Sequence, residues 1–172
     1  SFTFAIKASQ RITHHARLKP ESKDLVYYLL KNTEVLGDKL GPVLFQLPPN
    51  MKKDIERLRA FLEFLPAGRK FTIAFRNSTW FEEDVVDALR AKDVAMTIID
   101  QDDFVTPPIA TASWGYVRLH RFDYDAKSLA DWPREKAKEL DAEGLPATQV
   151  LEATIAASEK AGHRWPVRYI VK

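Results

Sequence analysis

The sequence predicts an α/β protein with a largely parallel sheet, and three observations support this class. Apolar runs with strand-like alternation recur along the chain, at 2–7, 42–47, 70–75, 94–99, 115–120 and 166–171. Amphipathic stretches with helical spacing separate the first four runs, at 20–37, 54–65 and 81–91. Strands that alternate with helices in this way form parallel βαβ units. Either a doubly wound open sheet or a (β/α)8 barrel fits this pattern.

Capping signals place the predicted helix ends. Gly37 suits the C-cap of the first helix, and Asn50 can cap the helical region that follows the second strand. Thr79 with Glu82 resembles a capping box that opens the third helix. No glycine-rich phosphate loop follows the first strand, which disfavours a Rossmann-type nucleotide fold. Two further helical stretches are expected at about 127–140 and 147–161.

Composition limits the classes of function. The 172 residues predict one domain, and 26 Lys and Arg against 24 Asp and Glu give a net charge of +2. No dense Lys/Arg run supports a nucleic-acid surface, and the lack of cysteine excludes disulfides and thiolate catalysis. No apolar stretch is long enough to span a membrane and no signal peptide is visible, so we expect a cytoplasmic protein without membrane contact.

Polar side chains collect at the carboxyl ends of the predicted strands. Alternation puts bulky apolar residues on one side of each strand, where helices would cover them, and the polar residues on the other. Barrel enzymes place their chemistry at these ends. The polar set comprises Lys7, Gln46, Arg76, Arg118 and His120, and Asp100 ends the strand at 94–99.

The charge of this set predicts an anionic ligand. Lys7, Arg76 and Arg118 are cationic and His120 can be, whereas Asp100 alone opposes them. Buried cations without a counter-charge are costly, so a phosphate or carboxylate group is the expected partner. Asp100, Asp102 and Asp103 do not form an ordinary metal site with such basic neighbours, and we expect neither a metal nor a cofactor.

Each of these residues also has a purely structural interpretation. Lys7 could be a solvated strand end, Gln46 a partner of loop backbone, and His120 a satisfied core histidine. Arg76 and Asp100 could form a structural ion pair. Loop exposure explains His14 and His15, and packing explains Trp80 and Tyr124. The joint case for a site is stronger, because five strand ends are polar on the same side.

Five segments resemble the motifs of a bacterial family called domain of unknown function 72 (YecE-like). They are "FAIKASQRITH", "LGPVLFQLPPN", "FRNSTWF", "VAMTIID" and "YVRLHRFDYDAKSLADW", and they cover about residues 2–132 in the family's order. The resemblance implies a TIM-type barrel and supplies no reaction. Its motif positions correspond here to Lys7, Thr13, His14, Gln46, Arg76, Trp80, Asp100, Arg118, His120 and Tyr124.

The chain departs from the family pattern in three places. Ala74 stands where the family typically has a glutamate, two residues before Arg76. The family's first two βα units are absent, so about six of eight barrel strands are expected. The segment after Trp132 lacks the family's usual last strand, for which "HRWPVRYIVK" is the substitute.

Three functions remain open from the sequence. The first is an enzyme, such as a hydrolase or lyase, in which His120 is the general acid or base and Asp100 orients it. Lys7, His14, Gln46, Arg76, Arg118, Trp80 and Tyr124 would then bind an anionic small molecule. The second, favoured by Ala74, is a binding module without catalysis for an anion or, with less support, a nucleic-acid end. The third is a barrel fragment that self-associates.

Overall fold

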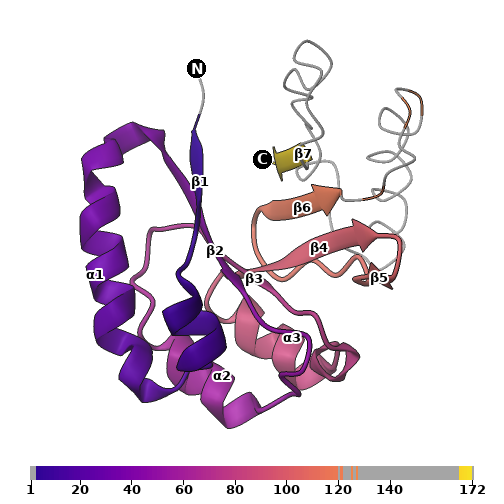
Figure 1. Cartoon of the computed structure of the whole chain (residues 1–172), viewed down its shortest axis with the longest axis horizontal. Coiled ribbons are helices and arrows are strands. Elements are labelled where there is room, and N and C mark those ends of the chain that lie inside the picture. The colour runs from indigo at the N-terminus through magenta and orange to yellow at the C-terminus, as the bar shows by residue number, and fades with distance from the viewer. Residues whose placement is uncertain (1–2, 120, 122–124, 126, 128–166, 172) are drawn as a thin grey trace.

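The computed structural model describes residues 3–119, 121, 125, 127 and 167–171, and it shows an α/β fold built on a mixed sheet (Figure 1). Six strands follow one another in the order β1-β2-β3-β4-β6-β7, and β5 pairs with β4 beside this path. The strands are β1 (Phe4–Lys7), β2 (Leu40–Gln46), β3 (Phe71–Ala74), β4 (Ala95–Gln101), β5 (Phe104–Val105), β6 (Gly115–Leu119) and β7 (Val167–Val171).

Three α-helices follow the first three strands, as the amphipathic spacing predicts. They are α1 (Lys23–Thr33), α2 (Ile55–Leu62) and α3 (Glu83–Arg90). Shorter helical segments are η1 (Arg11–His15), η2 (Pro20–Ser22), η3 (Glu34–Lys39) and η4 (Ser78–Trp80). The predicted helices at 127–140 and 147–161 lie outside the described residues. Within the described part of the chain, no helix is long and apolar enough to cross a bilayer.

Neighbouring strands of the sheet are mostly neighbours in sequence. β1, β2, β3, β4 and β6 are parallel to one another, each beside the next along the chain. A doubly wound sheet reverses its strand order at a switch point, whereas this succession is consistent with a barrel-like fold.

Two strands depart from the parallel pairing that the sequence predicts for most of the sheet. β7 is antiparallel to β6, and β5, a strand that the sequence analysis does not predict, is antiparallel to β4. For β5 the reason is local, because Asp102 and Asp103 form a two-residue turn. A connection that short can join only antiparallel strands, since a parallel pair needs a crossover of a dozen residues or more.

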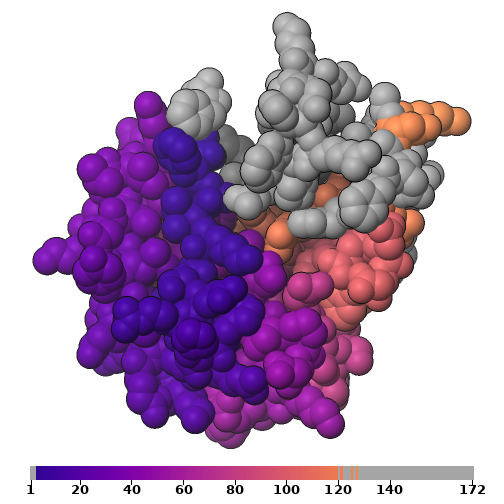
Figure 2. Space-filling view, in the orientation of Figure 1, coloured from indigo at the N-terminus to yellow at the C-terminus, as the bar shows by residue number. Residues whose placement is uncertain are grey.

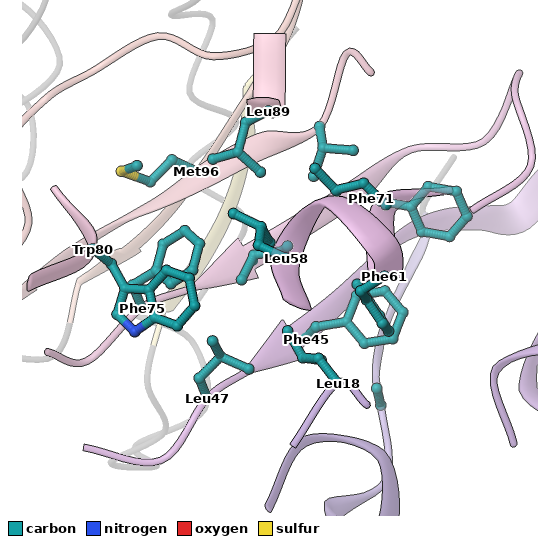
Figure 3. Packing of buried hydrophobic residues seen from close by; sticks show 14 of the residues in the cluster. Leu18, Phe45, Leu47, Leu58, Phe61, Phe71, Phe75, Trp80, Leu89 and Met96 are labelled. Atoms are coloured by element: carbon teal, nitrogen blue, oxygen red, sulfur yellow. The ribbon is translucent and has the colours of Figure 1, made fainter. Parts of the chain in front are cut away.

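The main hydrophobic core fills the space between the sheet and its helices. Figure 1 shows α1, α2 and α3 around one face of the sheet, and Figure 3 shows Leu58 and Phe61 of α2 packed against strand residues. Phe45 of β2 meets Phe61 edge-to-face, with ring centroids 5.1 Å apart. The predicted alternation is confirmed here, because the residues that it assigns to the helix side in and directly after β2 and β3 all join this cluster: Val43, Phe45, Leu47, Phe71, Ile73 and Phe75.

A clasp of hydrogen bonds joins the loop after β2 to the loop after β3. Trp80 is fully buried, stacks on Phe75 at 4.8 Å between ring centroids, and donates from Nε1 to the Met51 carbonyl at 2.7 Å. Asn77 Nδ2 donates to the Pro49 carbonyl at 2.9 Å. These contacts fix the two loops to each other at the carboxyl ends of their strands.

Two predicted caps are wrong because tertiary contacts take the side chains elsewhere. Thr79 Oγ1 accepts from the Lys53 amide at 2.9 Å, and the residue at the N-cap of α3 is Glu82. Asp54, rather than Asn50, caps α2 by accepting from the Arg57 amide at 3.0 Å. Gly37 lies beyond the end of α1 and has a positive φ of 48°, a conformation that favours glycine.

We predict that Trp80→Phe lowers the free energy of unfolding by about 1–3 kcal/mol. Phenylalanine keeps the ring stacked on Phe75 but leaves the buried Met51 carbonyl without its donor. Urea denaturation measures the change, with exposed Lys52→Ala as the control expected within about 0.5 kcal/mol of the parent protein. Equal stability of Trp80→Phe and the parent would show that the clasp contributes nothing.

Candidate functional site

Three of the predicted polar residues lie at the carboxyl ends of the parallel strands, on the face that α1, α2 and α3 do not cover. Lys7 ends β1, Gln46 ends β2, and Arg118 lies near the end of β6. Neighbouring positions of this face form a second, smaller apolar cluster, which consists of Leu44, Ala74, Ala95, Ile99, Trp114 and Tyr116. We call this side of the sheet the inner face.

Arg118 and Gln46 form a direct hydrogen bond across the inner face. Arg118 Nη1 donates to Gln46 Oε1 at 2.6 Å, although β3 and β4 lie between the two strands. Three strand spacings in a flat sheet are roughly 14 Å. The two long side chains can meet across that distance because the residue beside Gln46 on β3 is the small Ala74. Strand alternation predicts that both residues lie on one face but does not indicate this bond.

Arg76 brings a second guanidinium to the same end of the sheet. It follows Thr72 and Ala74 at strand spacing, so it continues the inner-face row two residues beyond the end of β3. The side chain is half-buried. Within the described part of the chain, Arg76 has no hydrogen bond or ion pair.

Asp100 belongs to the opposite face of the sheet from Arg118. The register pairs Ile99 with Arg118 and Asp100 with Leu119, so Asp100 alternates away from the inner face. Its carboxylate is buried, with 4% of the residue exposed, and accepts from Arg121 Nε at 2.6 Å. The structural pair that the sequence suggested for Arg76 is therefore made by Arg121, a residue that sequence reasoning missed.

His14 lies in η1, a short π-helix that follows the carboxyl end of β1. Its Nδ1 is 2.9 Å from Thr13 Oγ1. Partial burial, followed by the positive charges of Lys7, His15 and Arg17, lowers the pKa of His14 below the usual 6.5. The neutral imidazole is consequently the favoured form near neutral pH, and Lys7 and His14 are electrostatic neighbours as the sequence grouped them.

Three predicted site residues remain. One of them lies in the hydrophobic core, and the other two fall outside the described residues. Trp80 is fully buried in the helix-side core, which supports its packing interpretation rather than ligand contact. His120 and Tyr124 are the two whose placement falls outside the described residues. Among the residues that are described, no three His, Asp or Glu side chains gather as a metal site would require.

A separate cleft of about 690 Å³ opens at the other end of the sheet, beside the amino ends of β3, β4 and β6. Its lining includes four cationic residues, of which three already have carboxylate partners. Arg69 pairs with Glu34 and Lys92 with Glu63, each at 2.9 Å, and Arg90 pairs with Asp87 at 3.9 Å. Lys70 lies over the ring of Trp114 at 5.4 Å from its centroid. These contacts account for the cleft's charges locally, which distinguishes it from the carboxyl ends.

Comparisons with known proteins agree with this α/β architecture. A solved structure of a DUF72 family protein from Thermotoga maritima matches with a TM-score of 0.67 and 23% identity, over 82% of this chain and 63% of that one. A DUF72 family protein from Enterococcus faecalis matches with a TM-score of 0.64 and 16% identity, over 82% of this chain and 67% of that one. A search among curated proteins finds no match.

The fold and its strand-end polar row define an α/β protein of barrel-like sheet order. The family model described as protein of unknown function DUF72 matches residues 1–162, and the chain belongs to that family. It spans about 63% of the length of the Thermotoga maritima protein, so the activity of a complete family member is a matter for proposal. At these identities the solved structures support the fold alone.

We predict a coupling free energy of about 1–3 kcal/mol between Arg118 and Gln46 in a double-mutant cycle of unfolding. The four proteins are the parent, Gln46→Ala, Arg118→Ala and the double variant, measured by urea denaturation. A matched cycle of Gln46→Ala with Arg59→Ala, an exposed residue of α2, should be additive. Additivity in the Arg118 cycle would mean that the 2.6 Å contact is not a stabilising interaction in solution.

Proposed function

We propose that this chain forms part of a TIM-type barrel that binds a small anionic molecule at the carboxyl ends of its strands. The five parallel strands β1, β2, β3, β4 and β6 would be strands of such a barrel, whereas the antiparallel β7 departs from it. The sequential parallel order from β1 to β6 supports the barrel, and the Arg118–Gln46 bond across two intervening strands is consistent with it. Barrels of this type place their ligand sites at the carboxyl ends.

The observation that carries the proposal is the half-buried Arg76, which has no ion pair within the described residues. Arg118 shares its face and donates to the Gln46 amide oxygen. The sequence predicts that Asp100 opposes these positive charges, but its carboxylate is bound to Arg121 on the other face. Holding guanidinium groups near one another in a partly dry setting is costly without an anion between them.

Phosphate or carboxylate is the ligand group that this arrangement fits. A guanidinium holds either group through two parallel hydrogen bonds, and Arg76 and Arg118 could approach it from the ends of β3 and β6, on either side of β4. Lys7 adds positive charge at the same end of the sheet, and His14 lies close enough to feel that charge. Gln46 would orient the ligand through the Arg118 side chain that it already holds.

For catalysis we assign His120 as general acid or base, because an imidazole titrates near neutral pH. Asp100 would act on it indirectly. Its bond to Arg121 anchors the residue that directly follows His120 in the chain, which would fix the direction of that segment. Asp100 would then orient His120, as the sequence analysis predicts, but through the neighbouring Arg121.

Ala74 favours a second candidate function, anion binding without turnover. It is fully buried on the inner face and is the direct strand partner of Gln46. A glutamate in its place would lie beside both Gln46 and the guanidinium of Arg118. Without that carboxylate the site has fewer groups able to accept a proton, so binding is the simpler activity for this chain.

We predict that Arg76→Met weakens sulfate or phosphate binding at least tenfold, because a charge-assisted bidentate contact is lost. Isothermal titration calorimetry with inorganic sulfate measures the dissociation constant. Arg59→Met, which removes an exposed arginine of α2 whose partner is Glu56, should leave binding unchanged. Equal affinities for the parent protein and Arg76→Met would contradict the proposed site.

Ala74→Glu separates the two candidate functions. The new carboxylate should pair with Arg118 and compete with the anion, so weaker sulfate binding without turnover supports a binding module. Turnover of phosphate esters or carboxylate esters that appears only in Ala74→Glu supports an enzyme site that lacks its base. Ala74→Gln, similar in size and uncharged, is the control for steric effects. If sulfate affinity is the same in all three proteins, Ala74 does not face the site.

A further inference from the structure

The loop that follows β1 has an unusual backbone around His14. A π-helix at Arg11–His15 is followed by two consecutive non-glycine residues with positive φ, Arg17 at 50° and Leu18 at 60°. Short π-helical turns occur frequently at functional sites, and strained residues persist only where their surroundings hold them. Here the backbone amide of the fully buried Leu18 donates to the Ile12 carbonyl at 3.2 Å. This hydrogen bond closes the loop that carries His14.

Thr13 can serve the imidazole of His14 in both protonation states. Its Oγ1 lies 2.9 Å from His14 Nδ1 and 3.4 Å from the Ser9 carbonyl. A hydroxyl group can either donate or accept. When His14 is charged, Nδ1–H donates to Thr13 Oγ1, and the threonine hydrogen turns toward Ser9. When His14 is neutral, the hydroxyl can donate to Nδ1 instead. His14 therefore keeps its hydrogen bond to Thr13 when the imidazole is protonated.

The charges that act on His14 are all positive. Lys7 comes from β1, while His15 and Arg17 come from η1 and the residues that follow it. Within the described part of the chain, no carboxylate is among these neighbours. Arg17 is directed toward His14 from its own loop, because its Nε donates to the His14 carbonyl at 3.3 Å, and its Nη2 reaches Asn50 Oδ1 at 3.4 Å. An anion that enters here would offset the repulsion that, together with partial burial, keeps the ring neutral.

We propose that binding of an anion at the carboxyl ends of the strands is coupled to uptake of one proton by His14. The proton comes from solvent, the neutral imidazole becomes an imidazolium, and its free N–H donates to an oxygen of the anion. The inference rests on the proposed anion site and adds a residue, a proton and a pH dependence to it. His14 thereby becomes a ligand-binding residue whose charge is present only when the ligand is.

The sign of the pH dependence follows from the lowered pKa of free His14. Partial burial and the neighbouring cations favour the neutral ring, and a bound anion favours the charged ring, so the pKa rises on binding. Affinity must then increase as pH falls through the range between the two values, by up to tenfold per pH unit for one proton. Above that range both states hold a neutral His14 and the affinity stops changing.

Calorimetry with inorganic sulfate tests this coupling, because sulfate stays a dianion between about pH 5 and 8, where histidine titrates. The same titration in two buffers of different ionisation enthalpy counts the protons taken up. The parent protein and His15→Gln, which keeps His14, should take up close to one proton. His14→Gln should take up none and bind with a flat pH profile. Proton uptake unchanged in His14→Gln would overturn the inference.

Two further outcomes separate this inference from the proposed function. Sulfate binding without proton uptake in the parent protein would leave the anion site standing and overturn the role of His14. Absence of sulfate binding at any of these pH values would overturn both. If His14→Gln fails to fold, NMR titration of the His14 ring in the parent protein decides: its midpoint must rise when sulfate is added, and an unchanged midpoint contradicts the proposal.

Discussion

The hydrogen bond between Arg118 and Gln46 is the contact on which the rest of this structure depends. It joins β2 to β6 over two intervening strands, so both side chains extend across the inner face. Small side chains on that face leave room for such a contact. The sequence supplies them at Ala5, Thr72, Ala74, Ala95 and Thr97, and the two threonine hydroxyls meet at 2.7 Å.

The two faces of the sheet divide stability from the proposed binding. The helix-covered face holds the aromatic core of Phe45, Phe61, Phe75 and Trp80, and Trp80 also clasps the loops at the carboxyl ends (Figure 3). In the space-filling view, the indigo to pink part of the chain forms one continuous packed surface (Figure 2). The inner face gathers cations instead, with Arg76 and Arg118 close to where β3 and β6 end.

Period-two alternation made much of this arrangement predictable. It assigns Phe45 to the helices and Gln46 to the inner face from the strand alone, because neighbouring side chains must point to opposite sides. The same rule applied from Met96 through Ile98 places Asp100 on the helix side, as the register confirms. Its partner Arg121 could not be predicted, since it follows the end of β6 and meets Asp100 only in the folded sheet.

Other features depend on contacts far apart in sequence and could not be predicted locally. Thr79 has the spacing of a helix cap, yet the amide of Lys53 takes its hydroxyl. The antiparallel direction of β7 depends on how its segment returns to β6. The π-helix around His14 has no propensity signature of its own, because it depends on the buried Leu18 and the closing bond to Ile12.

A crystal structure of the protein in sulfate tests the central claim most directly. We expect an ordered sulfate at the carboxyl ends of β3 and β6, within hydrogen-bond distance of the guanidinium groups of Arg76 and Arg118. Its position would also show whether His14 lies within reach of the same anion. Sulfate ordered only in the cleft at the opposite end of the sheet, beside Lys70 and Trp114, would contradict the proposed site.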